Sequence, residues 1–467
     1  MTNYKTSYDV AIIGGGFSGT MLAVQLMRLS TGGQSIVVVN RDGRPGCGIA
    51  FGTEYDAHLL NTRVGGMSAL PDQPDHFLKW IRRRVDHRMD SDRFVPRRLY
   101  GLYIEELFRE HVKASPEVLI SWIVDEVEGA RIEGGCVCLK MRTGDEIRAR
   151  LAVLATGNYG RSSPAALMGV SRRHYASDPW SKSEVSQIPS CGTILLLGSG
   201  LTAVDQVLGL EARNFTGTVV MLSKHGLLPS VHTAKALQDK TWEWGFPTAI
   251  PSLVSLIRRQ IKIASAEGIC WRQIIDSLRP ESEQIWKSLP LREQKRFVRH
   301  VSPVWNVLRH RIPPESHVIL RKLISSEKVK LFAGRLLDCK NHEHRVEIRF
   351  RERSTGKEVS LFVDFVINCT GSEGGKLLVE NPFVKSIVDC GVAQPNPLGL
   401  GLDVDENGAL IGPSGAPSRL LFAIGPLRKG RLWETTAVAE IRRQATRLAT
   451  QISTRLHSEA CLINRQG

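Results

Sequence analysis

Three glycines near the N-terminus have the spacing of a dinucleotide-binding turn. Gly14, Gly16 and Gly19 spell G-x-G-x-x-G between an apolar stretch, 10–13, and an apolar helical pattern over 20–26. In such a turn the first glycine allows a sharp bend, the second lets the backbone approach a pyrophosphate, and the third lets the helix pack against the strand. The free amides at the start of the helix then face the phosphates. The stretch therefore predicts a strand, a phosphate-binding turn and a helix.

The same pattern occurs a second time, over 193–210. An apolar segment again leads into two glycines and a helical pattern, and an alanine stands at the third position, which the pattern tolerates. Two dinucleotides in one chain are most simply used for hydride transfer from a nicotinamide to a flavin. We therefore expect FAD at the first turn and NAD(P) at the second. The second turn consists of Gly198, Gly200, Leu201, Thr202 and Ala203.

The residues after the second strand of each unit bear on the choice of nucleotide. At that place an acidic residue binds the ribose 2′-hydroxyl, but the second unit has Ser223 and Lys224 there. A hydroxyl and a cation suit a 2′-phosphate, so we expect NADPH rather than NADH. The alternative is that Lys224 is a solvated lysine. In the first unit the place is taken by Asn40 and Arg41, and Asn40 can bind a ribose hydroxyl only without charge.

Composition limits the class of protein and its partners. A chain of 467 residues is long enough for two or three domains. The net charge of +15 fits anionic partners, and without an aromatic-basic RNA motif these are the two dinucleotides rather than nucleic acid. No apolar run is long enough to cross a membrane, and the N-terminus does not resemble a signal peptide. Nine scattered cysteines without C-x-x-C predict reduced thiols, no metal site and a cytoplasmic protein. The oligomeric state stays open.

The order of the patterns predicts an α/β fold with two Rossmann-like domains. We expect a discontinuous FAD domain, 1–178 and 331–467, with the NAD(P) domain, 192–326, inserted into it. Apolar segments at 329–333, 345–351 and 361–368 are expected to return the chain to the FAD sheet. A last strand near 419–427 and a helix over 434–450 close the domain, with the helix dipole at the flavin.

A helical region, 242–324, is assigned to the NAD(P) domain. It is rich in arginine, histidine and tryptophan, among them Trp271, Trp286, Trp305 and Arg309. Two interpretations stay open. The region is a wall of the substrate or cofactor site, or it is an insertion whose tryptophans form a small core and whose arginines are solvated.

Several segments resemble a bacterial family of FAD/NAD(P)-binding proteins, most of them without an assigned function. The resemblance covers almost the whole chain. The layout is also similar to that of NADPH-dependent flavin monooxygenases, amine N-hydroxylases included. The most specific segments are His58–Asn61, Met67–Asp72, Phe94–Arg97, Asp178–Trp180, Leu398–Val404 and Trp433–Glu434.

The resemblance implies positions for the cofactor-binding residues. It places Met67 and Ser68 beside the flavin ring, with His58, Asn61 and Arg63 as candidates for the lining of that site. No catalytic acid or base follows from it. With the turns described above, the candidate set is completed by Phe17, Ser18, Gly48, Val127, Ala155, Thr156, Gly157, Gly371, Gly425, Trp433, Glu434 and Thr435.

The reaction that the resemblance implies is NADPH-driven hydroxylation of a small molecule through a C4a-hydroperoxyflavin. The monooxygenase pattern F-x-G-x-x-x-H is not intact around His174 and Trp180, which favours a flavin reductase or dehydrogenase that inserts no oxygen. Cys47 has no second cysteine near it, so disulfide-reductase chemistry is disfavoured. A non-catalytic flavoprotein is the third alternative, although it would not need the intact second turn.

Overall fold

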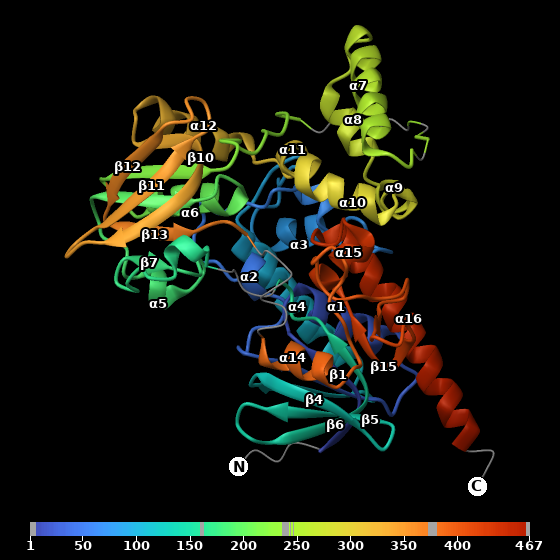
Figure 1. Cartoon of the computed structure of the whole chain (residues 1–467). Helices are drawn as coiled ribbons and strands as arrows, with labels where there is room; N and C mark the ends of the chain where they lie inside the picture. Colours follow the sequence, from blue (N-terminus) through green and yellow to red (C-terminus); the bar gives the residue numbers. More distant parts are fainter. Residues whose placement is uncertain are drawn as a thin grey trace.

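Two separate sheets carry the two glycine turns in the computed structural model (Figure 1). The structure describes residues 6–158, 163–235, 242, 244–245, 247–371 and 381–463, with side chains as far as 458. One lobe contains both ends of the described chain, the second lobe lies beside it, and a group of helices rises from the first lobe next to the second.

The first sheet has the strand order β14-β15-β6-β1-β2-β3, with the β4–β5 hairpin attached to β6. Its central strand β1 (Ser7–Ile13) lies parallel to β2 and β6 and is buried on both faces, which explains its continuous apolar sequence. The other strands are β2 (Ser35–Asn40), β3 (Leu119–Val124), β4 (Val127–Glu133), β5 (Cys136–Met141), β6 (Glu146–Leu154), β14 (Ala409–Ile411) and β15 (Pro417–Ala423).

Helices cover both faces of the first sheet. On one face α1 (Phe17–Leu29) packs between α4 (Arg97–Ala114) and the long α16 (Val438–Ile463), and their apolar residues form one core. On the other face α14 (Pro382–Asp389) packs against β4 and buries Phe383 and Val384. Shorter helices lie between these, namely α2 (Gly48–Phe51), η1 (Val64–Gly66) and α3 (His76–Arg84).

The second sheet has the order β12-β11-β10-β9-β8-β13-β7. It carries α6 (Leu201–Ala212) after the second glycine turn and α12 (Pro314–Ser325) packed on α6. Two short elements, η2 (Ala165–Leu167) and α5 (Lys182–Val185), lie beside it. Its strands are β7 (Tyr175–Ala176), β8 (Thr193–Leu197), β9 (Thr218–Ser223), β10 (Val329–Asn341), β11 (Val346–Glu352), β12 (Glu358–Val363) and β13 (Phe365–Asn368).

The expectation that the chain returns to the first sheet at 331 is wrong. Strand β13 lies parallel between β8 and β7, and β10 extends the second sheet from β9. From the described part of the later chain, the strands that join the first sheet are β14 and β15, with α14 and α16 on its faces. The strand β7, expected in the first domain, also pairs in the second sheet. An apolar segment indicates burial, but it does not say which sheet it joins.

The helical region is also attached differently from the expectation. Its apolar core includes Trp286 and Phe297 together with Trp433 from the first lobe, whose ring centroid lies 5.0 Å from that of Trp286 and 4.8 Å from that of Phe297. The tryptophans therefore do form a small core, but it rests on the first lobe. The elements are α7 (Ile250–Ala266), α8 (Trp271–Ser277), α9 (Ser282–Ser288), α10 (Leu291–Arg296), η3 (Phe297–Val301) and α11 (Ser302–Arg309). From the first lobe α15 (Lys429–Leu432) contacts α9, and η4 (Gly425–Arg428) lies next to α15.

A buried ion pair joins the two lobes. Arg97, at the start of α4, lies 2.8 Å from the carboxylate of Asp205 on α6, and the two side chains are 14% and 8% exposed. His58 adds a second contact, since its Nε2 donates to the Asp205 carbonyl oxygen at 2.9 Å. Arg97 and His58 both come from segments that resemble the FAD/NAD(P)-binding family. The contacts fix α6, and with it the second glycine turn, against the first lobe.

A further contact between the lobes involves a partly buried histidine, His232. The Nε2 of His232 donates to the carbonyl oxygen of Asn61 at 3.0 Å, and Arg63 donates to the carbonyl oxygen of Thr233 at 2.6 Å. Burial, followed by the charge of Arg311, lowers the pKa of His232 to about 4. His232 is therefore neutral at pH 7.

Removing Arg97 should destabilise the protein strongly. Arg97→Met leaves the Asp205 carboxylate buried without its cation, which costs about 3–5 kcal/mol in the free energy of unfolding. Urea unfolding followed by circular dichroism measures this cost. The neighbouring Arg98→Met is the control, because its pair with Asp56 is exposed and worth at most about 1 kcal/mol. Equal losses in the two variants would contradict the assignment of the buried pair as the link between the lobes.

Acid should weaken the fold through His232. Its pKa is about 4 when folded against 6.5 when unfolded, so the unfolded state takes up a proton first as the pH falls from about 6.5 to 4. This removes up to ~1.4 kcal/mol of stability for each pH unit. His232→Gln keeps a donor for the Asn61 carbonyl but cannot titrate, so its unfolding free energy should fall less steeply over that window. The same slope in both proteins would show that His232 does not contribute.

Candidate functional site

The first glycine turn is built by close backbone contacts. Gly14 has φ +107°, and a Cβ on it would lie 2.5 Å from the carbonyl oxygen of Ala155. A Cβ on Gly19 would lie 1.9 Å from the carbonyl oxygen of Gly14. A Cβ on Gly16, in contrast, would have one described neighbour within 4 Å, the Cα of Gly48 at 3.7 Å. The turn is therefore tight behind Gly14 and Gly19 and open in front of Gly16.

The sequence interpretation missed the glycine in between. A Cβ on Gly15 would lie 2.3 Å from the ring of Trp122, which enters from β3. The Gly15 amide also donates to Oδ1 of Asn40 at 2.9 Å, and Nδ2 of Asn40 donates to the carbonyl oxygen of Asp42 at 3.1 Å. Asn40 thus holds the turn in place with both ends of its amide. Arg41 forms an ion pair with Glu126 and is largely exposed.

The region around the first turn fits an FAD pyrophosphate. Helix α1 starts after Gly16 with no capping side chain and no acidic residue in its first turn, so its amide groups and positive dipole end are available. The hydroxyl of Thr156, next to the Ala155 carbonyl, is buried and has no hydrogen-bond partner. A buried hydroxyl of this kind calls for a partner. Gly157 follows with φ +72° and open space beside it.

The closing unit meets the first turn through a buried hydrogen-bond network. A Cβ on Gly425 would lie 2.6 Å from the hydroxyl of Ser18, so the two segments touch. The Gly425 amide donates to Gln444, Gln444 donates to the Thr435 hydroxyl, and that hydroxyl donates to the Gly425 carbonyl oxygen, at 3.0, 2.8 and 2.7 Å. Gln444 was not predicted. Its one signal in the sequence is its place beside Ile441 and Ala445, which face the core.

The final helix begins later than expected. It starts at Val438 and not at Glu434, because the Thr435 hydroxyl is bound to Gly425 and Trp433 has φ +59°, which a helix does not allow. Glu434 instead accepts a hydrogen bond from Nε1 of Trp305 in the helical region at 3.0 Å.

Other predicted residues fall into three groups. Met67 is buried in the core below α1, and the Ser68 carbonyl oxygen accepts from Arg442 of α16 at 2.6 Å. Phe17 is buried at the start of α1, whereas Val127 is part of the apolar core on the opposite face of the sheet. His58, Asn61 and Arg63 contact the second lobe, as described above.

The second turn repeats the geometry of the first. Gly198 has φ +125°, and a Cβ on it would lie 2.5 Å from the carbonyl oxygen of Cys369 at the end of β13. A Cβ on Gly200 would have no neighbour within 4 Å. Ala203 is fully buried, Leu201 and Thr202 start α6, and the first turn of α6 again has no cap and no acidic residue. Gly371 follows β13 and so lies in the second lobe.

The residues after β9 gather positive charge. The Ser223 hydroxyl is bonded to Ser199 at 2.7 Å and accepts from the Gly226 amide, so it shapes the turn. Lys224 is exposed, and Nη1 of Arg353 donates to Nδ1 of His225 at 2.7 Å. Burial, followed by the charges of Arg353 and Lys224, lowers the pKa of His225. Arg353 was not predicted, because it follows β11, far along the chain.

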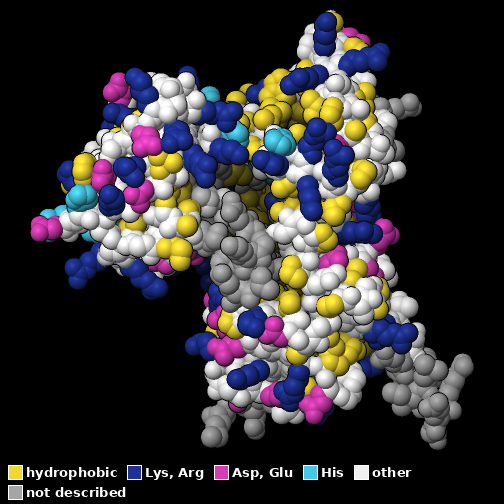
Figure 2. All heavy atoms as spheres, viewed as in Figure 1, with side chains coloured by type: hydrophobic (Ala, Val, Ile, Leu, Met, Phe, Trp, Pro, Cys, Tyr) yellow, Lys and Arg dark blue, Asp and Glu magenta, His cyan; other side chains and the backbone are white. Residues whose placement is uncertain are grey.

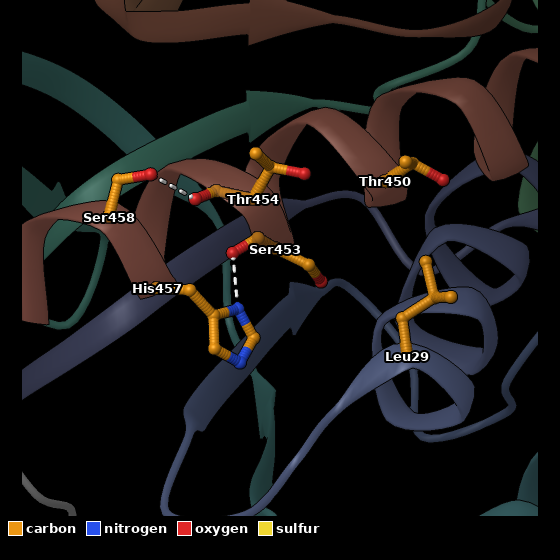
Figure 3. A pocket seen from close by; sticks show the side chains of 6 residues that line it. All are labelled: Leu29, Thr450, Ser453, Thr454, His457 and Ser458. Atoms are coloured by element: carbon orange, nitrogen blue, oxygen red, sulfur yellow. Dashed lines mark hydrogen bonds between the residues drawn. The ribbon is translucent and has the colours of Figure 1, made fainter. Parts of the chain in front are cut away.

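Two surface features lie outside these turns. Lys and Arg side chains gather along the hollow between the second lobe and the helical region (Figure 2). A separate shallow hollow is lined by Leu29 and by Thr450, Ser453, Thr454, His457 and Ser458 of α16 (Figure 3). Leu29 ends α1, so this hollow lies about 19 Å along the helix from the first turn and does not belong to it.

Two negative findings hold for the described part of the chain. It contains no cluster of three or more histidine, cysteine or acidic residues that could hold a metal ion. None of its helices combines the length and the apolar sequence that crossing a membrane requires.

Comparisons with known proteins agree with the geometry. Residues 11–159 match a family model described as FAD-NAD(P)-binding, and no curated protein matches the sequence. The fold is similar to the reduced form of ornithine hydroxylase from Pseudomonas aeruginosa, at 13% identity and a TM-score of 0.65 over 96% of this chain and 100% of that one. It is also similar to the ornithine N-hydroxylase of Kutzneria sp. 744 with reduced FAD, NADP⁺ and L-ornithine, at 14% identity and a TM-score of 0.62 over 96% and 99%.

A reductase shares the fold less closely. The bacillithiol disulfide reductase of Bacillus cereus is similar at 14% identity and a TM-score of 0.53, over 96% of this chain and 99% of that one. The two glycine turns, the match over 11–159 and the near-complete coverage agree. We conclude that the chain contains an FAD-NAD(P)-binding region and has the two-lobed fold of the flavin-dependent monooxygenases and reductases.

Proposed function

We propose that the protein is an FAD-dependent monooxygenase that takes electrons from NADPH and hydroxylates a small molecule. The observation that carries the proposal is that both glycine turns have the same geometry and are open at the same position, Gly16 in one and Gly200 in the other. The likeness of nearly the whole chain to two ornithine hydroxylases supports the monooxygenase over other flavin enzymes.

FAD supplies the redox chemistry when it is bound, because it accepts a hydride from the nicotinamide and passes electrons on to oxygen. The protein positions it. The start of α1 and the Thr156 hydroxyl would bind the pyrophosphate side, and the Gly425–Thr435 unit, fixed by Gln444, would support the flavin end. The helical region packs against Trp433 and would exclude water from that end.

NADPH is favoured over NADH by the charges beyond β9. Lys224, His225 and Arg353 lie together, and both charges that act on the pKa of His225 are positive. Because His225 accepts a hydrogen bond at Nδ1, its Nε2 carries the proton and can donate. A 2′-phosphate carries close to two negative charges and needs such donors. Ser223 contributes to the shape of this site rather than a free hydroxyl.

A reductase that inserts no oxygen is the second candidate. The incomplete F-x-G-x-x-x-H pattern and the likeness to bacillithiol disulfide reductase favour it. A disulfide substrate is disfavoured, since Cys47 is buried and burial raises the pKa of its thiol.

One experiment separates the two candidates. The FAD-loaded protein is first reduced by NADPH without oxygen, which should bleach the flavin. Oxygen and a panel of primary amines are then added, and hydrogen peroxide and hydroxylated product are measured. We expect product to form at the expense of peroxide with at least one amine. Complete recovery of the electrons as peroxide with every amine would favour the reductase, and no bleaching would overturn both.

Gly16→Ala should lose FAD while keeping the fold. The new Cβ makes an ordinary contact with Gly48 at 3.7 Å, so the chain tolerates it, but it occupies the open side of the turn. Absorbance of the purified protein and of its heat-released supernatant measures FAD content, and circular dichroism measures the fold. Gly19→Ala is the contrasting variant and should unfold the turn, since its Cβ would lie 1.9 Å from a carbonyl oxygen. Full FAD content in Gly16→Ala would contradict the site.

Arg353→Gln and Lys224→Ala should each weaken the use of NADPH. Loss of a charge-assisted hydrogen bond costs about 1.5–3 kcal/mol, so kcat/KM for NADPH should fall roughly ten- to hundredfold. The value for NADH should barely change, because NADH has no 2′-phosphate. Steady-state kinetics with both nucleotides measure this difference, with Arg351→Gln on the same hairpin as the control, since Arg351 pairs with Glu358. An equal loss for both nucleotides would contradict the assignment.

A further inference from the structure

An unusual arginine lies where the helical region meets the closing unit of the first lobe. Arg309 ends α11, and its side chain is only 12% exposed. Its Nε and Nη2 are buried and have no hydrogen-bond partner. The nearest acidic oxygen is Oε2 of Glu434, which lies 3.8 Å from Nη2 and so beyond hydrogen-bond distance.

The charges around Arg309 do not balance. Glu440 is fully engaged by Arg279, at 2.6 and 2.9 Å, and Asp276 is engaged by Arg311, at 2.9 Å. Among the described residues, the ion-pair partner of Arg309 is Glu434, which also faces a second cation, Lys429, whose ammonium lies over the ring of Trp433 at 5.1 Å.

The neighbouring groups do not supply the missing negative charge. Burial and then the charge of Arg309 lower the pKa of His310 to about 4, so this ring is neutral at pH 7. One carboxylate therefore serves two cations, and neither Nε nor Nη2 of Arg309 has an anion within hydrogen-bond distance. A buried charge without a partner is costly, and natural proteins retain such groups mainly where they act.

The geometry of the free nitrogens indicates the shape of the missing partner. Nε and Nη2 lie on the same edge of the guanidinium and point their hydrogens in parallel. This edge matches the two oxygens of a carboxylate, with which it forms a bidentate pair. Because Glu434 precedes Thr435 of the closing unit, a carboxylate bound here would lie near the flavin end of the first lobe.

We propose that this boundary binds a carboxylate group of the substrate, with the Nε–Nη2 edge of Arg309 as its main partner and Lys429 as a second cation. The identification of the ligand as the substrate rests on the proposed monooxygenase function. The binding of a carboxylate at Arg309 does not rest on that function. Phe297 and Trp305 are apolar side chains of the same core.

Thermal unfolding of the full FAD-loaded protein tests the proposal. The probes are hexanoate, hexan-1-ol and sulfate at equal ionic strength. Hexanoate should raise the unfolding midpoint with increasing concentration, and the other two should not. Arg309→Gln should raise the apparent Kd for hexanoate at least about tenfold. Arg309→Lys, which keeps the charge without the fork, should lose part of the effect. Arg299→Gln, exposed in the same helical region, should behave like the wild type.

The outcomes are decisive in either direction. The ligand-free midpoint of Arg309→Gln should equal or exceed that of the wild type, because a buried cation whose Nε and Nη2 have no hydrogen-bond partner is removed. A lower midpoint would make Arg309 a structural residue and overturn the proposal. Equal shifts with sulfate and hexanoate would mean an adventitious ion only, and an unchanged hexanoate shift in Arg309→Gln would also overturn it. Since this measurement uses neither NADPH nor oxygen, its failure and the failure of the monooxygenase reaction are distinguishable.

Discussion

The structure depends on one contact that occurs in both lobes, between the first glycine of a turn and a carbonyl oxygen from a distant strand. Gly14 lies against Ala155, and Gly198 lies against Cys369. In both cases a Cβ added to the glycine would lie 2.5 Å from the carbonyl oxygen of the partner. In each lobe the carbonyl ends a strand that is parallel to the strand before the turn. Each glycine turn is therefore completed only after two strands that lie far apart in the sequence have paired, β1 with β6 in the first lobe and β8 with β13 in the second.

This constraint explains which parts of the molecule could be predicted from sequence. The glycine turns and single strands are local, and the apolar segment 345–351 is strand β11 (Val346–Glu352), with its bounds shifted by one residue. The partner of a strand is not local. Phe365–Asn368 reads as a buried strand in either sheet, and only its register with β8 and β7 decides the matter. Arg353 and Gln444 were missed for the same reason, since their partners lie elsewhere in the chain.

The helical region shows the same limit for helices. It follows the second turn in sequence, which made the NAD(P) domain its obvious neighbour. Its tryptophan core is completed by Trp433, and its acceptor for Trp305 is Glu434, both more than a hundred residues later. A periodic pattern reveals that a helix has an apolar face. It does not reveal what covers that face.

The Arg97–Asp205 pair and the His58 contact have a consequence for the way the two nucleotides work together. A rotation of one lobe against the other at every turnover would have to break the buried ion pair between Arg97 and Asp205 and expose both charges. Separating the two charges of a buried ion pair costs about 3–5 kcal/mol of free energy. These contacts therefore oppose a rotation of one lobe against the other.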